Sequence, residues 1–189
     1  MATSVRAQGH AVDDQAFRLQ LERNAIWNRM VAVGDRLPDL PLLEVDLGAI
    51  HLSRLRQTGP VVLLFIRHAN SPECGAALRL YRDSLAPGLA ALDAHLVAVS
   101  PQAAEPLAAV KRRHDLDFFV ASDGRHALID AFNLGFSSPG AGPTLGTGRS
   151  VLPFAAVVVA DRSGIVRFTD VRADWSTRTS PSRILQAVR

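Results

Sequence analysis

Cysteine chemistry is the first possibility that this sequence raises, because it contains a single cysteine, Cys74. Cys74 follows Ser71, Pro72 and Glu73, and a serine followed by a proline is typical of a helix N-cap and a first helical residue. Cys74 then lies in the first helical turn, where unpaired backbone amides and the helix dipole favour a negative charge. We therefore expect a raised thiolate fraction, which Arg67 increases and Glu73 opposes.

Simpler interpretations of the same residues stay open from the sequence. A lone cysteine is often a small hydrophobic residue packed against a strand, and N-capping alone explains Ser71. His68 fits a histidine at a strand end or in a loop, with a catalytic role as the alternative. One cysteine and six histidines show no ligand-spaced pair, so we predict no metal site and no cofactor. The sequence also lacks the Gly-x-Ser-x-Gly elbow of a serine hydrolase.

Composition restricts the class of protein. The chain has 189 residues, 48% hydrophobic and 21% charged, which suits one buried core and is short for two domains. The longest apolar run, residues 61–66, is far below the roughly 20 residues of a membrane span, and residues 1–15 do not resemble a secretory signal. A lone cysteine suits a reducing compartment, so we expect a cytoplasmic protein without membrane contact. A net charge of +3, with one basic cluster at residues 111–114, predicts no nucleic acid binding.

Hydrophobic periodicity predicts the elements that position Cys74. Residues 61–66 form a continuous apolar run typical of a strand buried on both faces of a sheet. Residues 71–92 carry apolar side chains at spacings of three and four, which predicts an amphipathic helix that Pro87 kinks or divides. Residues 14–30 are amphipathic as well and predict an N-terminal helix.

The rest of the chain alternates predicted strands and helices. Residues 42–52 are typical of a β-hairpin, and residues 155–160 with 165–169 predict a second, antiparallel one. Residues 136–150 are rich in Gly, Ser and Pro and predict a long loop. The other predicted elements are strands at 95–100 and 118–121 and helices at 103–113, 126–132 and 181–188.

This order of elements predicts an α/β fold. Strands that alternate with helices imply parallel strands joined by right-handed crossovers, to which the second hairpin adds an antiparallel pair. We therefore predict a central mixed β-sheet flanked by helices over residues 34–189, preceded by an N-terminal helical extension over residues 1–33.

Several segments resemble the peroxiredoxin-like (AhpC/TSA, redoxin) family. Residues 65–74, Phe-Ile-Arg-His-Ala-Asn-Ser-Pro-Glu-Cys, resemble its active-site segment, a Pro-x-x-x-Thr/Ser-x-x-Cys pattern after a buried strand. The Asn-Ser-Pro-x-Cys part is most similar to peroxiredoxin Q. Residues 34–39 resemble the Gly-Asp-x-x-Pro-Asp-Phe opening of the family, and residues 97–102 and 161–168 resemble segments of a bacterial branch. The resemblance runs from about Gly34 to Arg189 and implies a thioredoxin-like fold.

The resemblance implies an antioxidant oxidoreductase, a thiol peroxidase that reduces hydrogen peroxide or small organic hydroperoxides. In that family a cysteine thiolate attacks a peroxide oxygen, becomes a sulfenic acid and is restored by a second thiol. Cys74 takes the place of the attacking thiol, Ser71 that of the hydroxyl contacting thiolate and peroxide, and Arg67 is the third candidate catalytic residue. With one cysteine in the chain, the resemblance implies a one-cysteine peroxidase that uses an external thiol or redoxin as reductant. We also expect a homodimer, which is common in the family.

Two positions depart from the family pattern. Arg67 stands where the family has its motif proline, and Ala155 stands in the column of its second arginine. Arg149 is a candidate replacement for that arginine, and His68 and Asn70 are the other candidate substrate-binding residues. The departures leave two alternatives. One is a catalytically degenerate scaffold or binding subunit; the other is a redirected enzyme that tailors a metabolite through its cysteine, or through His68 and Arg67 as an acid-base and anion-binding pair.

Overall fold

The structure, a computed structural model, describes residues 29–189, and its contacts group Val31–Arg189 into one compact unit. The predicted N-terminal helix over residues 14–30 lies almost wholly outside the described residues, so the extension over residues 1–33 stays a prediction. Within the described part of the chain, every helix is too short or too polar to cross a membrane.

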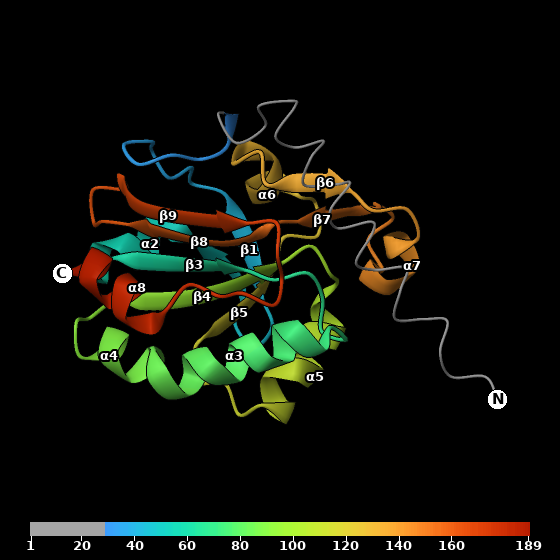
Figure 1. Cartoon of the computed structure of the whole chain (residues 1–189), viewed down its shortest axis with the longest axis horizontal. Helices are drawn as coiled ribbons and strands as arrows, with labels where there is room; N and C mark the ends of the chain where they lie inside the picture. Colours follow the sequence, from blue (N-terminus) through green and yellow to red (C-terminus); the bar gives the residue numbers. More distant parts are fainter. Residues whose placement is uncertain (1–28) are drawn as a thin grey trace. The chain divides into compact units, whose positions relative to one another are not determined.

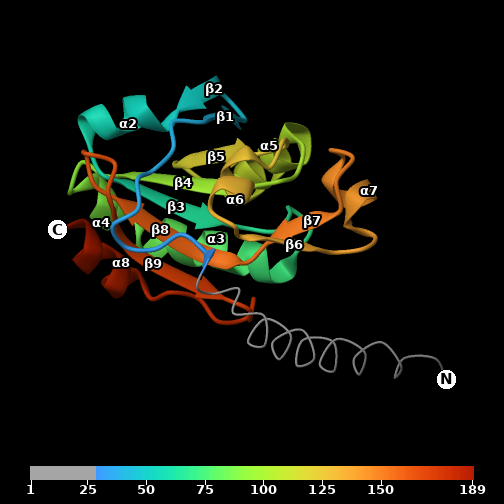
Figure 2. The same ribbon diagram turned by 90° about the horizontal axis from the view of Figure 1, so that it is seen from above.

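Seven strands form the central sheet in the order β2-β1-β5-β4-β3-β8-β9, which Figure 2 shows from β2 at one edge to β9 at the other. The strands are β1 (Pro41–Glu44), β2 (Gly48–His51), β3 (Val61–Phe65), β4 (His95–Ser100), β5 (Phe119–Ser122), β8 (Ala155–Ala160) and β9 (Val166–Arg172). Strands β3, β4 and β5 are parallel, whereas β8 is antiparallel to both β3 and β9. The predicted mixed sheet is confirmed.

Helices cover the sheet and bury β3 on both sides. The helices α3 (Pro72–Ser84), α4 (Ala86–Ala90), α5 (Ala104–Arg113) and α8 (Pro181–Val188) share one core with Val62 and Leu64 of β3. Figure 1 shows α3, α4 and α5 together beneath the sheet. Phe65 meets the ring of Phe132 edge-on, with centroids 6.0 Å apart, at the end of α6 (Ala127–Ala131). Alternate residues of β3 therefore pack on opposite faces, which explains why every residue of this strand is apolar and buried.

The strand register places the last residues of β3 and β9 at the same end of the sheet. Phe65 at the end of β3 lies opposite Ala156 of β8, and Ala155 lies opposite Arg172 at the end of β9. Because β3 and β9 are both antiparallel to β8, they run in the same direction. The segment that follows β9 therefore starts beside the segment that connects β3 to α3.

The predicted loop over residues 136–150 is wrong. This region contains most of β6 (Gly135–Ser137) and all of α7 (Ala141–Leu145), and β7 (Val151–Pro153) follows it. Strand β6 pairs with β7, the ring of Phe136 lies 5.0 Å from that of Phe154, and Leu145 is buried. Elements of three and five residues are too short to show periodicity among glycines, serines and prolines.

The other predicted elements are confirmed close to their predicted bounds. The helix predicted over residues 71–92 is divided before Pro87, since α3 ends at Ser84 and α4 begins at Ala86. Helix α2 (Leu52–Thr58), like α7, was not predicted.

Candidate active site

The start of α3 positions Cys74. Ser71 is the N-cap, Pro72 is the first helical residue, and the Cys74 backbone amide donates a hydrogen bond to Ser71 Oγ at 3.3 Å. The predicted position of the thiol in the first helical turn is confirmed. The Ser71 hydroxyl and the Cys74 amide are thereby tied together in one turn.

The side chain of Cys74 is fully buried within the core shared by β3 and α3. A buried thiol is what the interpretation of Cys74 as a packed hydrophobic residue predicts. In this conformation a peroxide reaches the sulfur only after the residues around it move.

Arg67, Ser71 and Glu73 form a connected polar network at the start of α3. Arg67 Nη2 donates to Ser71 Oγ at 3.1 Å and to Glu73 Oε2 at 3.0 Å. The hydroxyl of Ser71 donates to the same Glu73 oxygen at 2.7 Å. The hydrogen bond from Ser71 and the positive charge of Arg67 lower the pKa of the Glu73 carboxyl. The sequence anticipated that Glu73 opposes a negative thiol, and the structure adds that Glu73 engages both neighbouring side chains.

Backbone anchors hold the connection between β3 and α3. Ser100 Oγ donates to the carbonyl oxygen of Arg67 at 2.9 Å, and the amide of Ala69 donates to Gln102 Oε1 at 2.7 Å. Gln102 is buried, and its amide nitrogen donates to the carbonyl oxygen of Thr144 in α7 at 2.8 Å. The end of β4 therefore fixes this segment and links it to the region that the sequence predicted as a loop.

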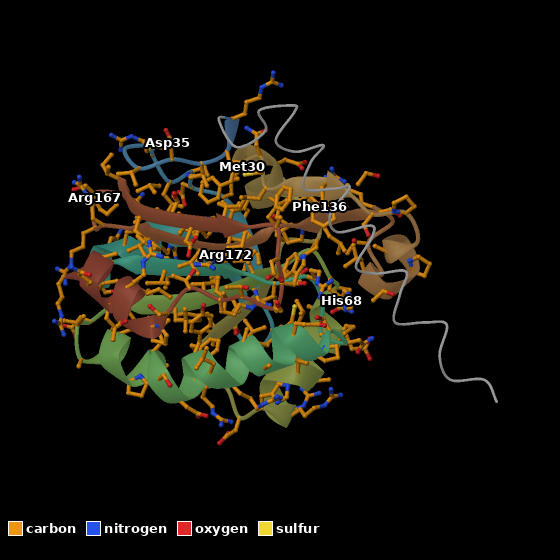
Figure 3. The ribbon with its side chains drawn as sticks, viewed as in Figure 1. Met30, Asp35, His68, Phe136, Arg167 and Arg172 are labelled. Atoms are coloured by element: carbon orange, nitrogen blue, oxygen red, sulfur yellow. The ribbon has the colours of Figure 1, made fainter. Side chains whose placement is uncertain are left out.

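His68 and Asn70 belong to the same connection but differ in exposure. His68 is half-buried, and its Nδ1 is buried without a hydrogen-bond partner. Burial and the charge of Arg67 lower the pKa of His68, so the imidazole is neutral at pH 7. Asn70 is exposed. In Figure 3, His68 lies on the Arg172 side of β9, away from Arg167.

Arg149 is engaged elsewhere. Its guanidinium group pairs with Asp130 at 2.9 Å and donates to the carbonyl oxygen of Arg125 at 3.1 Å. The structure gives Arg149 no contact with Ser71 or Cys74 within the described residues, so its role in binding substrate stays a prediction.

Two residues that sequence reasoning missed join the site from the segment after β9. The guanidinium carbon of Arg67 lies 4.5 Å from the ring centroid of Trp175, and that of Arg178 lies 5.5 Å from it. Both distances are within cation–π range. The indole of Trp175 therefore holds two guanidinium groups near the first turn of α3. Because Ala155 stands where the family has its second arginine, the sequence indicated that an arginine from another segment could replace it.

Solved structures define the fold class of this protein as that of peroxiredoxins with a thioredoxin-like fold. Reduced Prx3 from Vibrio vulnificus, solved in complex with H2O2, is 24% identical and has a TM-score of 0.71, covering 85% of this chain and 100% of that one. Peroxidoxin BcpB from Mycobacterium tuberculosis is 23% identical, with a TM-score of 0.69 and coverage of 83% and 97%. The predicted thioredoxin-like fold is confirmed.

The AhpC/TSA family profile matches residues 33–169, and the chain belongs to this family. Peroxiredoxin Bcp from Bacillus subtilis (strain 168) is 31% identical over 104 residues, which span 55% of this chain and 65% of that protein. The predicted peroxiredoxin-like family is thus confirmed, and the prediction of a peroxiredoxin-type oxidoreductase is confirmed at the level of the family.

Proposed function

We propose that this chain is a one-cysteine thiol peroxidase in which Cys74 reduces hydrogen peroxide or a small organic hydroperoxide. The observation that carries the proposal is the hydrogen bond from the Cys74 amide to Ser71 Oγ at 3.3 Å, which sets a hydroxyl and a thiol in one helical turn. Arg67 Nη2, 3.1 Å from the same oxygen, adds a positive charge. Membership of the AhpC/TSA family supports the same reaction.

In the proposed reaction the Cys74 thiolate attacks one oxygen of the peroxide. A sulfur–oxygen bond forms, the oxygen–oxygen bond breaks, and the departing oxygen takes a proton and leaves as water or an alcohol. Sulfur is thereby oxidised to a sulfenic acid. An external thiol attacks this sulfur and releases water, and a second thiol then resolves the mixed disulfide and restores Cys74.

The neighbouring side chains have defined tasks in this proposal. The hydroxyl of Ser71 carries one donor and two acceptor sites, so it can accept from the protein and donate to a thiolate or a peroxide oxygen. Arg67 stabilises the negative charge that passes from sulfur to the departing oxygen. Neutral His68 and exposed Asn70 are candidates to contact the part of the peroxide that does not react.

The reductant, the assembly and the location belong to the same proposal. The chain has one cysteine, so the resolving thiol comes from a low-molecular-weight thiol or a redoxin. We keep the homodimer and the cytoplasm as predictions, the latter because a free thiol suits a reducing compartment.

The alternative of a catalytically degenerate scaffold has one observation in its favour, the complete burial of Cys74. Family membership does not favour it. The two proposals differ in whether the thiol reacts in the folded protein, and one measurement separates them.

The deciding experiment treats the reduced protein with one equivalent of hydrogen peroxide and a sulfenic-acid trap and follows the intact mass over time. Because the chain has a single cysteine, every trapped product is assigned to Cys74 without mapping. The Cys74→Ser variant is the matched control, since the change replaces one sulfur by oxygen. Rapid trapping in the parent protein and none in Cys74→Ser is the expected result. A thiol that stays reduced for minutes, in a folded protein, excludes the peroxidase.

A further inference from the structure

One edge of the Arg178 guanidinium group is buried without a hydrogen-bond partner. Both Nε and Nη2 of Arg178 are inaccessible to solvent, and neither has a partner in the structure. These two nitrogens lie on the same side of the planar group, so their N–H bonds point together toward one place. The large majority of buried side-chain polar atoms in native proteins have a hydrogen-bond partner. This edge therefore lacks an acceptor, and the acceptor that fits two parallel N–H bonds is a carboxylate.

The surroundings of Arg178 place this edge near the proposed reaction centre. Arg178 lines a cavity of about 10 Å³ together with Ala155 at the start of β8 and Tyr81 of α3, so a carboxylate enters only after the side chains around it move. The ring centroid of Trp175 lies 5.5 Å from the guanidinium carbon of Arg178 and 4.5 Å from that of Arg67. Arg67 in turn contacts the cap of the helix turn that carries the thiol. A chain of contacts thus connects the unpaired edge to the start of α3.

Side chains close to Arg178 do not supply the missing acceptor. Tyr81 is buried, which raises its pKa to about 12, so it stays neutral, and its hydroxyl donates to the carbonyl oxygen of Thr179 at 2.8 Å. The positive charge of Arg178 contributes to lowering the pKa of Glu73, but the Glu73 carboxylate already pairs with Arg67 at 3.0 Å. Asp170, the other carboxylate near Tyr81, pairs with Arg172 at 2.8 Å, so neither carboxylate pairs with this edge of Arg178.

We propose that Arg178, held in place by Trp175, binds a carboxylate group of a reactant beside Cys74. The proposal rests on the proposed thiol peroxidase and specifies the chemistry of what the site accepts. The carboxylate belongs either to an organic hydroperoxide or to the thiol that reduces the sulfenic acid, because both must approach the same sulfur. Its two oxygens accept from Nε and Nη2 of Arg178, and its uncharged part extends toward Cys74.

The first experiment measures binding without any reaction. Hexanoate and the neutral hexanamide are titrated into the reduced protein, and binding is followed by NMR signals of the Trp175 indole. The variants are Arg178→Gln and Arg178→Lys, the second of which keeps the charge but loses the two-pronged geometry. Arg167→Gln is the control, because Arg167 is exposed, pairs with Asp161 at 2.7 Å and lies at the opposite end of β9 from Arg172.

The expected result is that hexanoate binds and hexanamide does not, with affinity about 10-fold to 100-fold weaker in Arg178→Gln. We expect the affinity of Arg178→Lys for hexanoate to lie between those of the parent protein and Arg178→Gln. The affinity of Arg167→Gln should equal that of the parent protein. The proposal is overturned if hexanoate and hexanamide bind equally, if hexanoate does not bind, or if the affinity is unchanged in both Arg178 variants. Water would then be the acceptor for Nε and Nη2 of Arg178.

The second experiment identifies the source of the carboxylate. Oxidation of Cys74 is timed with a carboxylate-bearing alkyl hydroperoxide and with its methyl ester, and reduction of the sulfenic acid with 3-mercaptopropionate and with its methyl ester. In one of the two steps the acid should react faster than its methyl ester, and Arg178→Gln should remove this difference. The reactant of that step is the one whose carboxylate binds Arg178. No advantage in either step overturns the proposal. A thiol that no peroxide oxidises instead contradicts the proposed peroxidase, while the hexanoate titration still decides whether Arg178 binds a carboxylate.

Discussion

The hydroxyl of Ser71 donates its hydrogen bond to the carboxylate of Glu73, at 2.7 Å. Its oxygen accepts from Arg67 and from the backbone amide of Cys74, at 3.1 Å and 3.3 Å. The single proton of the hydroxyl is therefore directed to a carboxylate and away from the thiol. For Ser71 to contact a thiolate or a peroxide, the hydroxyl must rotate away from Glu73, so Glu73 competes with the reaction.

The Glu73→Gln variant is expected to oxidise faster than the parent protein. The substitution removes the negative charge of the residue next to Cys74, weakens the acceptor for the Ser71 hydroxyl and removes the ion-pair partner of Arg67. An electrostatic gain at a partly exposed site corresponds to a rate increase of about 2-fold to 5-fold. The measurement is the rate of sulfenic-acid formation at Cys74 under a fixed concentration of hydrogen peroxide.

The matched control for Glu73→Gln is Asp83→Asn, which removes a negative charge near the other end of α3. Asp83 is exposed and pairs with Arg82 at 2.6 Å. We expect Asp83→Asn to oxidise at the parental rate. Equal rates for Glu73→Gln and the parent, or a slower variant, show that Glu73 does not compete for the hydroxyl.

Substitution of Ser71 separates stability from reactivity. Ser71→Ala removes the N-cap of α3, so we expect a loss of about 1 kcal/mol in the free energy of unfolding. It also removes the hydroxyl beside the thiol, for which we expect about a 100-fold slower oxidation of Cys74. Ser71→Thr keeps the hydroxyl and is expected to stay near the parent in both properties.

Denaturant unfolding and peroxide kinetics on the same samples test this prediction. Ser84→Ala is the control, because Ser84 is exposed at the last residue of α3 and caps nothing there. If Ser71→Ala is less stable but reacts at the parental rate, the serine is only a cap, as the simpler interpretation of the sequence holds.

The start of α3 could be predicted from the sequence because helix capping is local. Ser71 and Pro72 carry their preferences for the first helical positions in their own chemistry, and these fix where Cys74 lies. Trp175 and Arg178 could not be predicted in this way. They reach the site because β8 is antiparallel to both β3 and β9, a relationship that follows from sheet order rather than from any short pattern.

The same distinction holds for the fold. Strands β3, β4 and β8 have continuous apolar runs and were predicted closely. The region from Gly135 to Pro153 was not, because its elements are stabilised by contacts with the rest of the molecule, such as the packing of Phe136 on Phe154. The sequence left open whether Cys74 is a reactive thiol or a packed hydrophobic residue, since its burial depends on how closely α3 packs on the sheet.

Lys111 stabilises the fold through a buried carboxylate. Its ammonium group lies 2.7 Å from Glu44 Oε1 and 2.7 Å from Asp46 Oδ2, so this part of the basic cluster is not simply solvated. Burial alone raises the pKa of Glu44, but the hydrogen bonds from Lys111 and from backbone amides lower it overall. We expect Lys111→Met to lose about 3 kcal/mol at pH 7, because a buried carboxylate loses its partner.

The pH dependence of Lys111→Met provides a sharper test. A lowered folded pKa means that Glu44 contributes stability above its ordinary value of 4.5 and loses it as the pH falls through the folded pKa. The difference in the free energy of unfolding between the parent protein and Lys111→Met should therefore become smaller below pH 4.5. Arg112→Met, an exposed neighbour in α5, is the control. A difference that is the same at pH 7 and pH 4 contradicts the buried pair.

Asp123 is expected to give the opposite pH dependence. It is 3% exposed, and its Oδ2 accepts hydrogen bonds from the amides of Leu128 and Ile129 at 3.0 Å and 2.9 Å. Burial nevertheless raises the pKa of Asp123 above its ordinary value of 3.8. Its contribution to stability is thus complete below that value and is lost as the pH rises through the folded pKa. Asp123→Asn does not titrate, so its free energy of unfolding should rise relative to that of the parent between pH 4 and pH 7, measured by urea unfolding. A constant difference across this range shows that Asp123 does not titrate differently in the folded and unfolded states.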